Sequence, residues 1–281
     1  MLRRTIFDET PMSELALWAS RLAWFSIAVA ALSILIVRSG LLEVVPALAT
    51  FAAALGCAGL AILFALGAFV SIWRNGYRGL GRALIGLFLG LAILAYPAYQ
   101  AYRGSKLPAI GDITTDFVNP PRFDVLARLR PRGTSDYPGE KTAALQHTAY
   151  PEIVPLQVDL PAKQVYDIVQ KLIAKRKWLV VDARAPLGAR GTGTIEAVAR
   201  TTLFGFREDV AIRVTPARDG SRVDMRSASR YGFNDFGANA RRVRALLDDI
   251  DDAAGSASEP REEPEKPQPK PAPKRQPDKR R

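Results

Sequence analysis

Cysteine and histidine are almost absent from this chain of 281 residues, which contains one of each, Cys57 and His147. A single cysteine cannot form an intramolecular disulfide. The His and Cys clusters that bind zinc and other transition metals are also missing, so any metal ligands would have to be oxygen atoms. The sequence therefore predicts no metal site and no cofactor.

Motifs of catalysis are lacking as well. The chain has no Gly-x-Ser-x-Gly elbow, and the glycine-rich stretch at 188–193 has neither the spacing nor the flanking elements of a dinucleotide-binding loop. Glu196, Asp209 and Asp224 could form an acid–base pair, but we expect arginines to neutralise them on an open sheet face. The sequence predicts no catalytic residue.

Positive charge is in excess, with a formal net charge of +11, but no single region carries it. Residues 1–104 contribute +4, residues 255–281 contribute +3, and the residues between them contribute the remaining +4. A nucleic-acid-binding surface would concentrate this charge on one domain. We therefore expect no nucleic-acid partner.

Charge is missing altogether from two long stretches, residues 44–73 and 83–102. A third, residues 17–37, contains only Arg21. Each is close to or above the roughly 20 apolar residues that cross a bilayer core of about 30 Å. Residues 1–104 are predicted to form a membrane anchor of three transmembrane helices rather than a signal peptide, since no small-residue cleavage pattern precedes Arg38.

The orientation follows from the loop charges. Arg74, Arg78 and Arg82 lie together between the second and third spans, whereas Arg38 is offset by Glu43 in the other loop. The positive-inside rule places the arginine-rich loop and the N-terminus, with Arg3 and Arg4, in the cytoplasm. In a bacterium the chain would then be a multi-pass protein of the inner membrane with a periplasmic C-terminal domain.

Small residues in the spans suggest close helix contacts. Gly86 and Gly90 have the spacing of a small-xxx-small motif. They could pack within the three-helix bundle or mediate a homo-oligomer.

Residues 105–254 are predicted to form an extracytoplasmic α+β domain. Alternating apolar residues indicate strands near 153–158, 178–181, 194–200, 209–214 and 223–228. Two amphipathic helices are expected, one with Pro161 in its first turn and one capped by Asp235. We expect an antiparallel sheet of about five strands packed by two helices, with residues 107–150 as a connection. A sheet curved around the last helix would instead leave an apolar cavity.

The strand register can be predicted from the turns. A tight turn at Phe204-Gly205 would place Arg200 opposite Asp209 and Glu196 opposite Arg213. A turn at Arg218-Asp219 would place Arg213 opposite Asp224. The outer face of this meander should be charged and exposed to solvent.

The junction between the last strand and the last helix gathers polar side chains. Free backbone N–H groups at a helix start, together with arginines, can bind an anion, although capping and salt bridging would use the same residues. The candidate residues for ligand or partner binding are Arg226, Ser229, Arg230, Asp235, Asn239 and Arg242.

The last segment, residues 255–281, is rich in Pro, Glu and Lys and has too few apolar residues to fold. We expect a disordered tail, either simply solvated or in contact with anionic lipid or cell-wall polymer.

Several runs between the spans and the tail carry a family resemblance. They are DITTD at 112–116, PPRF at 120–123, YPEIVPL at 150–156, FGFRED at 204–209, SRVDMRSASR at 221–230 and DFGANARR at 235–242. In this order they resemble the DUF1499 family, a domain of unknown function. The resemblance implies a bacterial envelope protein with multiple spans and no established activity. It also moves the domain start to about Leu107 and adds Asp112 and Thr115 to the candidate site.

The predicted function is noncatalytic binding of a ligand or partner by the extracytoplasmic domain, the partners being the bilayer and either an envelope protein or a lipid-like ligand. The alternative is an envelope hydrolase or transferase that uses Asp209, Asp224 or Asp235. A closed apolar cavity would favour lipid-like binding, whereas two acids converging in a cleft would favour chemistry.

Overall fold

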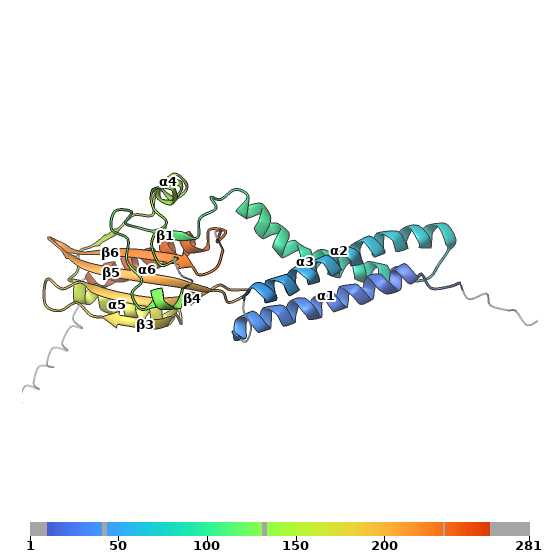
Figure 1. Cartoon of the computed structure of the whole chain (residues 1–281), viewed down its shortest axis with the longest axis horizontal. Helices are drawn as coiled ribbons and strands as arrows, with labels where there is room; N and C mark the ends of the chain where they lie inside the picture. The colour runs from blue at the N-terminus through green and yellow to red at the C-terminus, as the bar shows by residue number, and fades with distance from the viewer. Residues whose placement is uncertain (1–9, 41–43, 131–133, 233, 259–281) are drawn as a thin grey trace, which may run out of the picture.

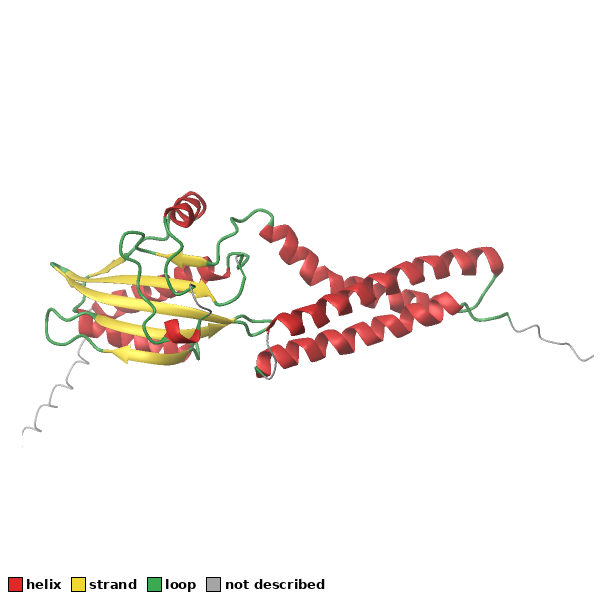
Figure 2. Ribbon diagram, in the orientation of Figure 1, coloured by secondary structure: helices red, strands yellow, loops and turns green. Residues whose placement is uncertain are grey.

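The computed structural model of this chain describes residues 10–40, 44–130, 134–232 and 234–258. Three long helices precede a globular domain in the chain. Figures 1 and 2 show these helices at one end of an elongated molecule and the domain at the other. The predicted fold class, a helical anchor followed by an α+β domain with an antiparallel sheet, is confirmed. Residues 255–258, which were predicted to begin the disordered tail, are helical instead. The rest of the predicted tail lies outside the described residues, as do the charges Arg3, Arg4 and Glu43 used for the orientation.

The anchor consists of α1 (Glu14–Ser39), α2 (Val44–Asn75) and α3 (Leu80–Gly104), each long and apolar enough to cross a membrane. The 32 residues of α2 span about 48 Å at 1.5 Å per residue, well over the roughly 30 Å of a bilayer core. If α2 crosses a bilayer upright, it extends past the hydrocarbon region.

Small residues form the interface between these helices. Ala16, Ala68 and Ala83 are buried together, and the Ser26 hydroxyl donates to the Ala54 carbonyl across α1 and α2 at 2.8 Å. A Cβ at Gly86 would lie 2.7 Å from the Ala19 side chain, and one at Gly90 would lie 2.7 Å from Ile62. These two glycines thus pack inside the chain's own bundle, while large apolar side chains face outward.

The domain is built on a six-stranded antiparallel sheet in the order β1-β6-β5-β4-β3, with β2 also paired to β6. The strands are β1 (Asp112–Thr114), β2 (Leu156–Val158), β3 (Leu179–Arg184), β4 (Gly193–Arg200), β5 (Arg207–Ala217) and β6 (Gly220–Ser229). Both β1 and β2 pair with the same edge of β6, one at each end of it. The sheet has one more strand than predicted because β1 lies in the expected connection.

The main core lies between one sheet face and two helices, α5 (Ala162–Lys175) and α6 (Ala238–Ser258). The two helices contribute Val169, Ile173, Leu246 and Ile250, and the sheet contributes alternate residues such as Ile212. These side chains pack against each other in the space where a sheet curved around the last helix was expected to leave an apolar cavity. The cavity described below lies elsewhere.

The opposite sheet face is covered, so the prediction of an open, solvated, charged face is wrong. A covering segment, residues 115–130, crosses this face and ends in η1, a short 3₁₀ helix (Leu126–Leu129). Phe123 and Leu126 pack on Val198, Ala211 and Ala228. The acidic side chains of the strands beneath this segment are buried: Glu196 is 4% exposed, Asp209 0% and Asp224 1%.

Glu196 holds this segment in place. One carboxylate oxygen accepts the backbone N–H groups of Asp124 and Val125 at 2.9 and 3.1 Å, and the other accepts that of Leu126 at 2.8 Å. A carboxylate at the start of a helix satisfies donors that have no partner within the helix. Glu196 is therefore a cap supplied by a distant strand.

The predicted register is correct at one hairpin and wrong at the other. Arg213 is paired with Asp224, as expected. In the other hairpin Arg200 faces Arg207, and Glu196 faces Ala211. The connection there is a six-residue loop, residues 201–206, rather than a two-residue turn. The ring of Phe204 stacks on that of Phe206 and packs edge-on against that of Phe51 in α2.

The expected connection at 107–150 is also partly structured. It contains β1, η1 and α4 (Glu140–Ala149). The buried Gln146 amide accepts from the Thr114 N–H at 3.0 Å and donates to the Thr114 carbonyl at 2.7 Å. This pairing gives the outer edge of β1 the bonds that a further strand would supply.

Replacing Glu196 with alanine should destabilise the domain, because three N–H groups at the start of η1 would lose their acceptor. We expect the free energy of unfolding to fall by about 2 to 3 kcal/mol, as for hydrogen bonds to a charged group. Thermal and denaturant unfolding of the full chain in detergent would measure this. Glu152→Ala, which removes an exposed ion pair with Arg244, is the control and should cost less than about 1 kcal/mol. Equal losses in both variants would contradict this role of Glu196.

Candidate functional site

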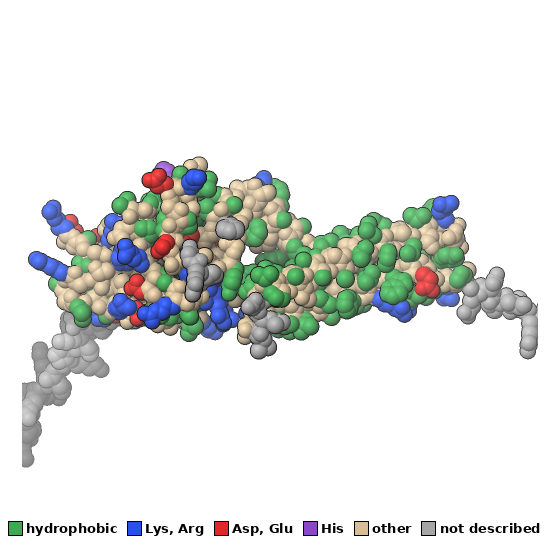
Figure 3. All heavy atoms as spheres, in the orientation of Figure 1, with side chains coloured by type: hydrophobic (Ala, Val, Ile, Leu, Met, Phe, Trp, Pro, Cys, Tyr) green, Lys and Arg blue, Asp and Glu red, His purple; other side chains and the backbone are tan. Residues whose placement is uncertain are grey.

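An open cavity of about 780 Å³ lies where the helices meet the domain. We call it the junction cavity. Its walls come from the first turns of α2, the last turns of α3, the loop at 201–206, the start of β5 and the segment 229–242. Figure 3 shows an opening between the apolar surface of the helices and the domain.

The loop at 201–206 attaches the domain to the ends of α1 and α2. The Arg38 guanidinium donates to the carbonyls of Thr202 and Leu203 at 2.7 and 3.1 Å. In return, the Arg200 guanidinium donates to the Arg38 carbonyl at 3.0 Å. The ring of Phe204 packs edge-on against that of Phe51 from α2, 4.9 Å between centroids. These contacts close one side of the junction cavity.

The wall formed by the helices is apolar. It includes Val44, Leu48 and Phe51 of α2, and Pro97 and Ala101 of α3. Figure 1 shows that α3 diverges from the other two helices toward the domain, which opens the space between α3 and α2. Pro97, inside α3, removes a backbone donor from the helix where this divergence occurs.

The wall formed by the domain is charged. Four arginines and two carboxyl groups line it: Arg200, Arg207, Arg241, Arg242, Glu208 and Asp235. With both carboxyl groups ionised, the arginines leave an excess of two positive charges (4 − 2). The junction cavity thus combines an apolar wall with a cationic one.

A buried polar cluster supports this wall. Glu208 forms an ion pair with Arg242 and accepts from the Ser229 hydroxyl at 3.2 Å. Arg242 also donates to the Asn239 side-chain oxygen at 2.6 Å and to the Ser227 hydroxyl at 3.0 Å. Arg242 is therefore held in place by its neighbours.

Asp235 caps α6, as predicted. Its carboxylate accepts the backbone N–H groups of Gly237 and Asn239. Burial raises the pKa of Asp235, whereas the two backbone hydrogen bonds and the nearby Arg242 and Arg241 act to lower it. Burial likewise raises the pKa of Glu208 against the opposing effect of Arg242. Both carboxyl groups of the cavity therefore bind a proton more readily than exposed ones.

The structure divides the predicted site residues between two places. Ser229, Asp235 and Arg242 line the junction cavity, and the fully buried Asn239 lies directly behind them. The Asn239 amide donates to the Ser229 hydroxyl and to the Gly111 carbonyl, both at 3.0 Å. These four residues form one connected group.

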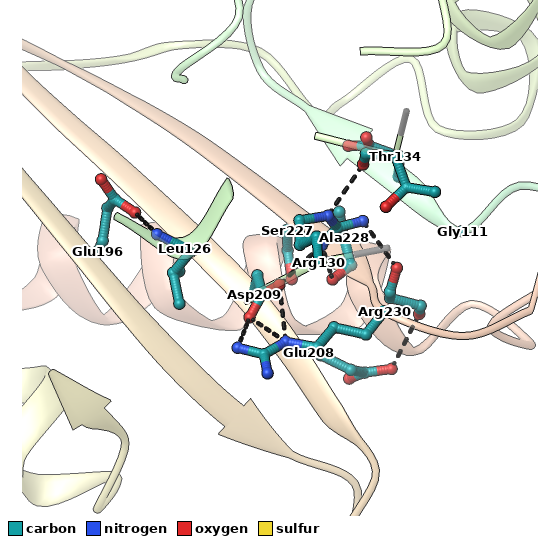
Figure 4. Close-up of polar contacts among 12 residues, drawn as sticks. Gly111, Leu126, Arg130, Thr134, Glu196, Glu208, Asp209, Ser227, Ala228 and Arg230 are labelled. Carbon is teal, nitrogen blue, oxygen red and sulfur yellow. Dashed lines mark hydrogen bonds and ion pairs between the residues drawn. The ribbon is translucent and has the colours of Figure 1, made fainter. Parts of the chain in front are cut away.

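Asp112, Arg226 and Arg230 lie instead beneath the covering segment. Arg226, 2% exposed, donates twice to Asp112 at 3.0 and 2.7 Å. Arg230 makes a two-pronged ion pair with Asp209, at 2.9 and 2.8 Å. Figure 4 shows Arg130 reaching the same carboxylate from the covering segment, at 2.8 Å. These guanidiniums are used within the fold.

Thr115 and Asp224 are similarly used within the fold. The Thr115 hydroxyl accepts the Met225 N–H at 2.9 Å, and the Thr115 N–H donates to the Met225 carbonyl at 2.9 Å. Asp224 is bound by Arg213 and by Arg222. Thr115 thus extends the pairing of β1 with β6, and Asp224 is neutralised by two arginines.

Sequence reasoning missed half of the junction cavity. Arg207, Glu208 and Arg241 belong to it, as do the aromatic side chains of Phe51, Phe204 and Phe206. The FGFRED run at 204–209 was a signal, since it places two aromatic rings beside a charged triplet. Nothing in the local pattern showed that α2 would meet it. Among the residues that the structure describes, no group of three His, Cys, Asp or Glu side chains could hold a metal ion.

The raised pKa of Glu208 predicts a pH dependence of stability. Between its ordinary value of 4.5 and the raised value, the folded chain holds a proton that the unfolded chain releases. The Tm of the wild type minus that of Glu208→Gln should therefore be largest below pH 4.5 and fall as the pH rises above it. Thermal unfolding in detergent on both sides of this pH tests it. A difference that grows with pH would contradict the burial of an acidic group here.

Comparisons with known proteins place the domain in a family. No curated protein matches the chain. A family model described as "Protein of unknown function (DUF1499)" matches residues 112–250, from β1 into α6. This range includes the covering segment, the whole sheet and the charged wall of the junction cavity. The globular domain of this chain therefore belongs to the DUF1499 family.

Proposed function

We propose that this chain is a noncatalytic, membrane-anchored envelope protein that binds an amphipathic, lipid-like ligand in the junction cavity. The observation that carries the proposal is the pairing of an apolar wall from α2 and α3 with a charged wall from the domain. The volume, about 780 Å³, lies within the roughly 300 to 1,000 Å³ of small-molecule sites.

The length of α2 supports this ligand class. If Trp73 and Arg74 mark one membrane interface, about 20 residues of α2 fill the hydrocarbon core. The first turns of α2, with Leu48 and Phe51, then lie at or beyond the interface next to the domain. Apolar side chains at this level favour cover by an apolar group. A lipid chain drawn partly out of the bilayer would provide it.

The environment of the acids argues against catalysis. Asp209 and Asp224 are buried beneath the covering segment and bound by arginines. Asp235 uses its carboxylate to cap α6, and Glu208 is paired with Arg242. A general base must reach the proton it abstracts, and these oxygens already accept bonds from the protein.

One observation favours the alternative, a hydrolase or transferase. Glu208 and Asp235 line the same cavity, and burial raises the pKa of both, as is common for catalytic acids. Chemical change of the bound molecule on incubation with the protein, lost in Glu208→Gln and Asp235→Asn, would establish this alternative.

Filling the junction cavity should remove the ligand. Ala101→Trp places an indole in the apolar wall without introducing charge, and we expect at least a tenfold loss of the copurifying amphiphile because the indole occupies its volume. Mass spectrometry of extracts from the detergent-purified full chain measures the molar ratio of bound molecule to protein.

Ala95→Trp is the matched control, since Ala95 is an exposed residue of the same helix outside the cavity lining. It should retain the wild-type ratio. If the wild type carries no amphiphile above the level found with Ala101→Trp, the proposal is wrong.

We also propose that the domain lies outside the cytoplasm, in the periplasm of a bacterium. Arg74 and Arg78 lie at the end of the bundle far from the domain, next to Arg82 in the first turn of α3. Such a cluster favours the cytoplasmic side. The three helices then carry the chain across the membrane to the domain.

A reporter fused after Arg103 tests this orientation. A reporter that is active only in the cytoplasm should stay silent there, whereas the same reporter fused between Asn75 and Leu80 should be active. The reverse pattern would place the domain in the cytoplasm.

A further inference from the structure

We propose that the ligand of the junction cavity is an anionic phospholipid, with its phosphate at Arg207 and Arg241 and its chains along α2 and α3. This inference rests on the proposed function and adds the charge and class of the ligand. It depends on which guanidiniums in the cavity are already neutralised and which are not.

Of the four arginines in this wall, Arg207 has the fewest side-chain hydrogen bonds and ion pairs. It is exposed at the start of β5, and within the described part of the chain its side chain has no hydrogen bond or ion pair. A Cβ at Gly40 would lie 3.3 Å from its guanidinium, so the group lies against the end of α1. The charge of Arg207 is thus held where the apolar helices end.

Arg241 and Arg200 also form no ion pair among the described residues. Arg241 donates one bond to the Phe236 carbonyl at 3.0 Å, and Arg200 donates one to the Arg38 carbonyl. Arg242 differs, because Glu208 neutralises it. The wall therefore keeps an excess of two positive charges, because Glu208 pairs with Arg242 and the carboxylate of Asp235 interacts electrostatically with Arg241.

A phosphate matches these donors. The planar guanidinium offers paired N–H groups that fit two phosphate oxygens, and such charge-assisted bonds are stronger than neutral ones. Arg207 and Arg241 line one cavity with Arg200. A zwitterionic headgroup would bring a cationic ammonium toward the same arginines, which disfavours it. The expected ligand therefore has a net negative headgroup.

The apolar wall distinguishes a lipid from a free phosphate. Leu48, Phe51, Pro97 and Ala101 line the part of the cavity between α2 and α3. These side chains have no charge or hydrogen-bond donor for an anion, but they can pack against acyl chains. Such chains would lie between α2 and α3, two helices that are long and apolar enough to cross a membrane. An anionic membrane lipid meets both walls.

Native mass spectrometry of the full chain in a neutral detergent tests the proposal. Phosphatidylglycerol and phosphatidylcholine with identical chains are titrated separately, and glycerol phosphate is added as a headgroup without chains. We expect phosphatidylglycerol to bind at least tenfold more tightly than phosphatidylcholine. In the double variant Arg207→Gln, Arg241→Gln phosphatidylglycerol should lose more affinity than phosphatidylcholine, because both lipids carry a phosphate but only phosphatidylglycerol has a net negative headgroup. The preference should fall about tenfold.

Arg218→Gln is the matched control, because Arg218 is exposed in the turn at the other end of β5. It should keep the wild-type preference, and unfolding curves check that each variant is folded. Ala101→Trp serves as a second test and should weaken both lipids.

Three other results would contradict one or both proposals. Equal binding of the two lipids, weakened by Ala101→Trp, would overturn the anionic assignment and leave the proposed function standing. Glycerol phosphate that binds as tightly as the lipid would overturn the lipid assignment. Absence of cavity-dependent binding by either lipid, together with no copurifying amphiphile in the wild type, would overturn both proposals.

Discussion

The arrangement of the domain depends on the ion pairs that neutralise one fully buried carboxylate, that of Asp209. Asp209 in β5 has no exposed surface and is bound by Arg130 from the covering segment and by Arg230 from the end of β6. A buried carboxylate is tolerated only when paired and hydrogen-bonded, so both arginines must stay in place. Arg130 thereby fixes the covering segment across one sheet face. Arg230 fixes the start of the segment that leads through Asp235 into α6, which is the charged wall of the junction cavity.

The same sheet serves two different environments. One face packs against α5 and α6 through aliphatic side chains. The other buries acids and arginines beneath a segment of only sixteen residues, 115–130, whose backbone N–H groups and guanidiniums complete the pairing. Arg226 is typical of an anion-binding site, but here it lies beneath the covering segment, where Asp112 neutralises it. Its role is therefore structural. At the open end of β6, by contrast, Arg207 and Arg241 form no ion pair among the described residues, and the proposed ligand would meet their charge there.

Elements with strong local signals could be predicted from the sequence, and contacts between distant segments could not. The three apolar helices, the Arg213–Asp224 pairing and the Asp235 cap follow from composition, turn chemistry and capping preferences. The register of β4 with β5 was missed because a six-residue loop joins the strands in place of the expected tight turn, and its Phe204 packs against Phe51 of the anchor. Alternation in the strands also cannot reveal that a proline-rich segment will cover their charged face. The candidate site was half found for the same reason: Ser229, Asp235 and Arg242 are close in sequence, whereas the apolar wall comes from the anchor.

The bonds between Arg38 and the loop at 201–206 attach the anchor to the domain beside the junction cavity, so under the proposed function the anchor is part of the binding site rather than a tether. An excised soluble domain would present Phe204 and Phe206 to water and would lose every side chain of α2 and α3 that lines the cavity. Its sheet and ion pairs could persist while its recognition surface is incomplete. Ligand searches with such a fragment would favour small anions over amphiphiles, so the choice of fragment would by itself decide which chemistry is found.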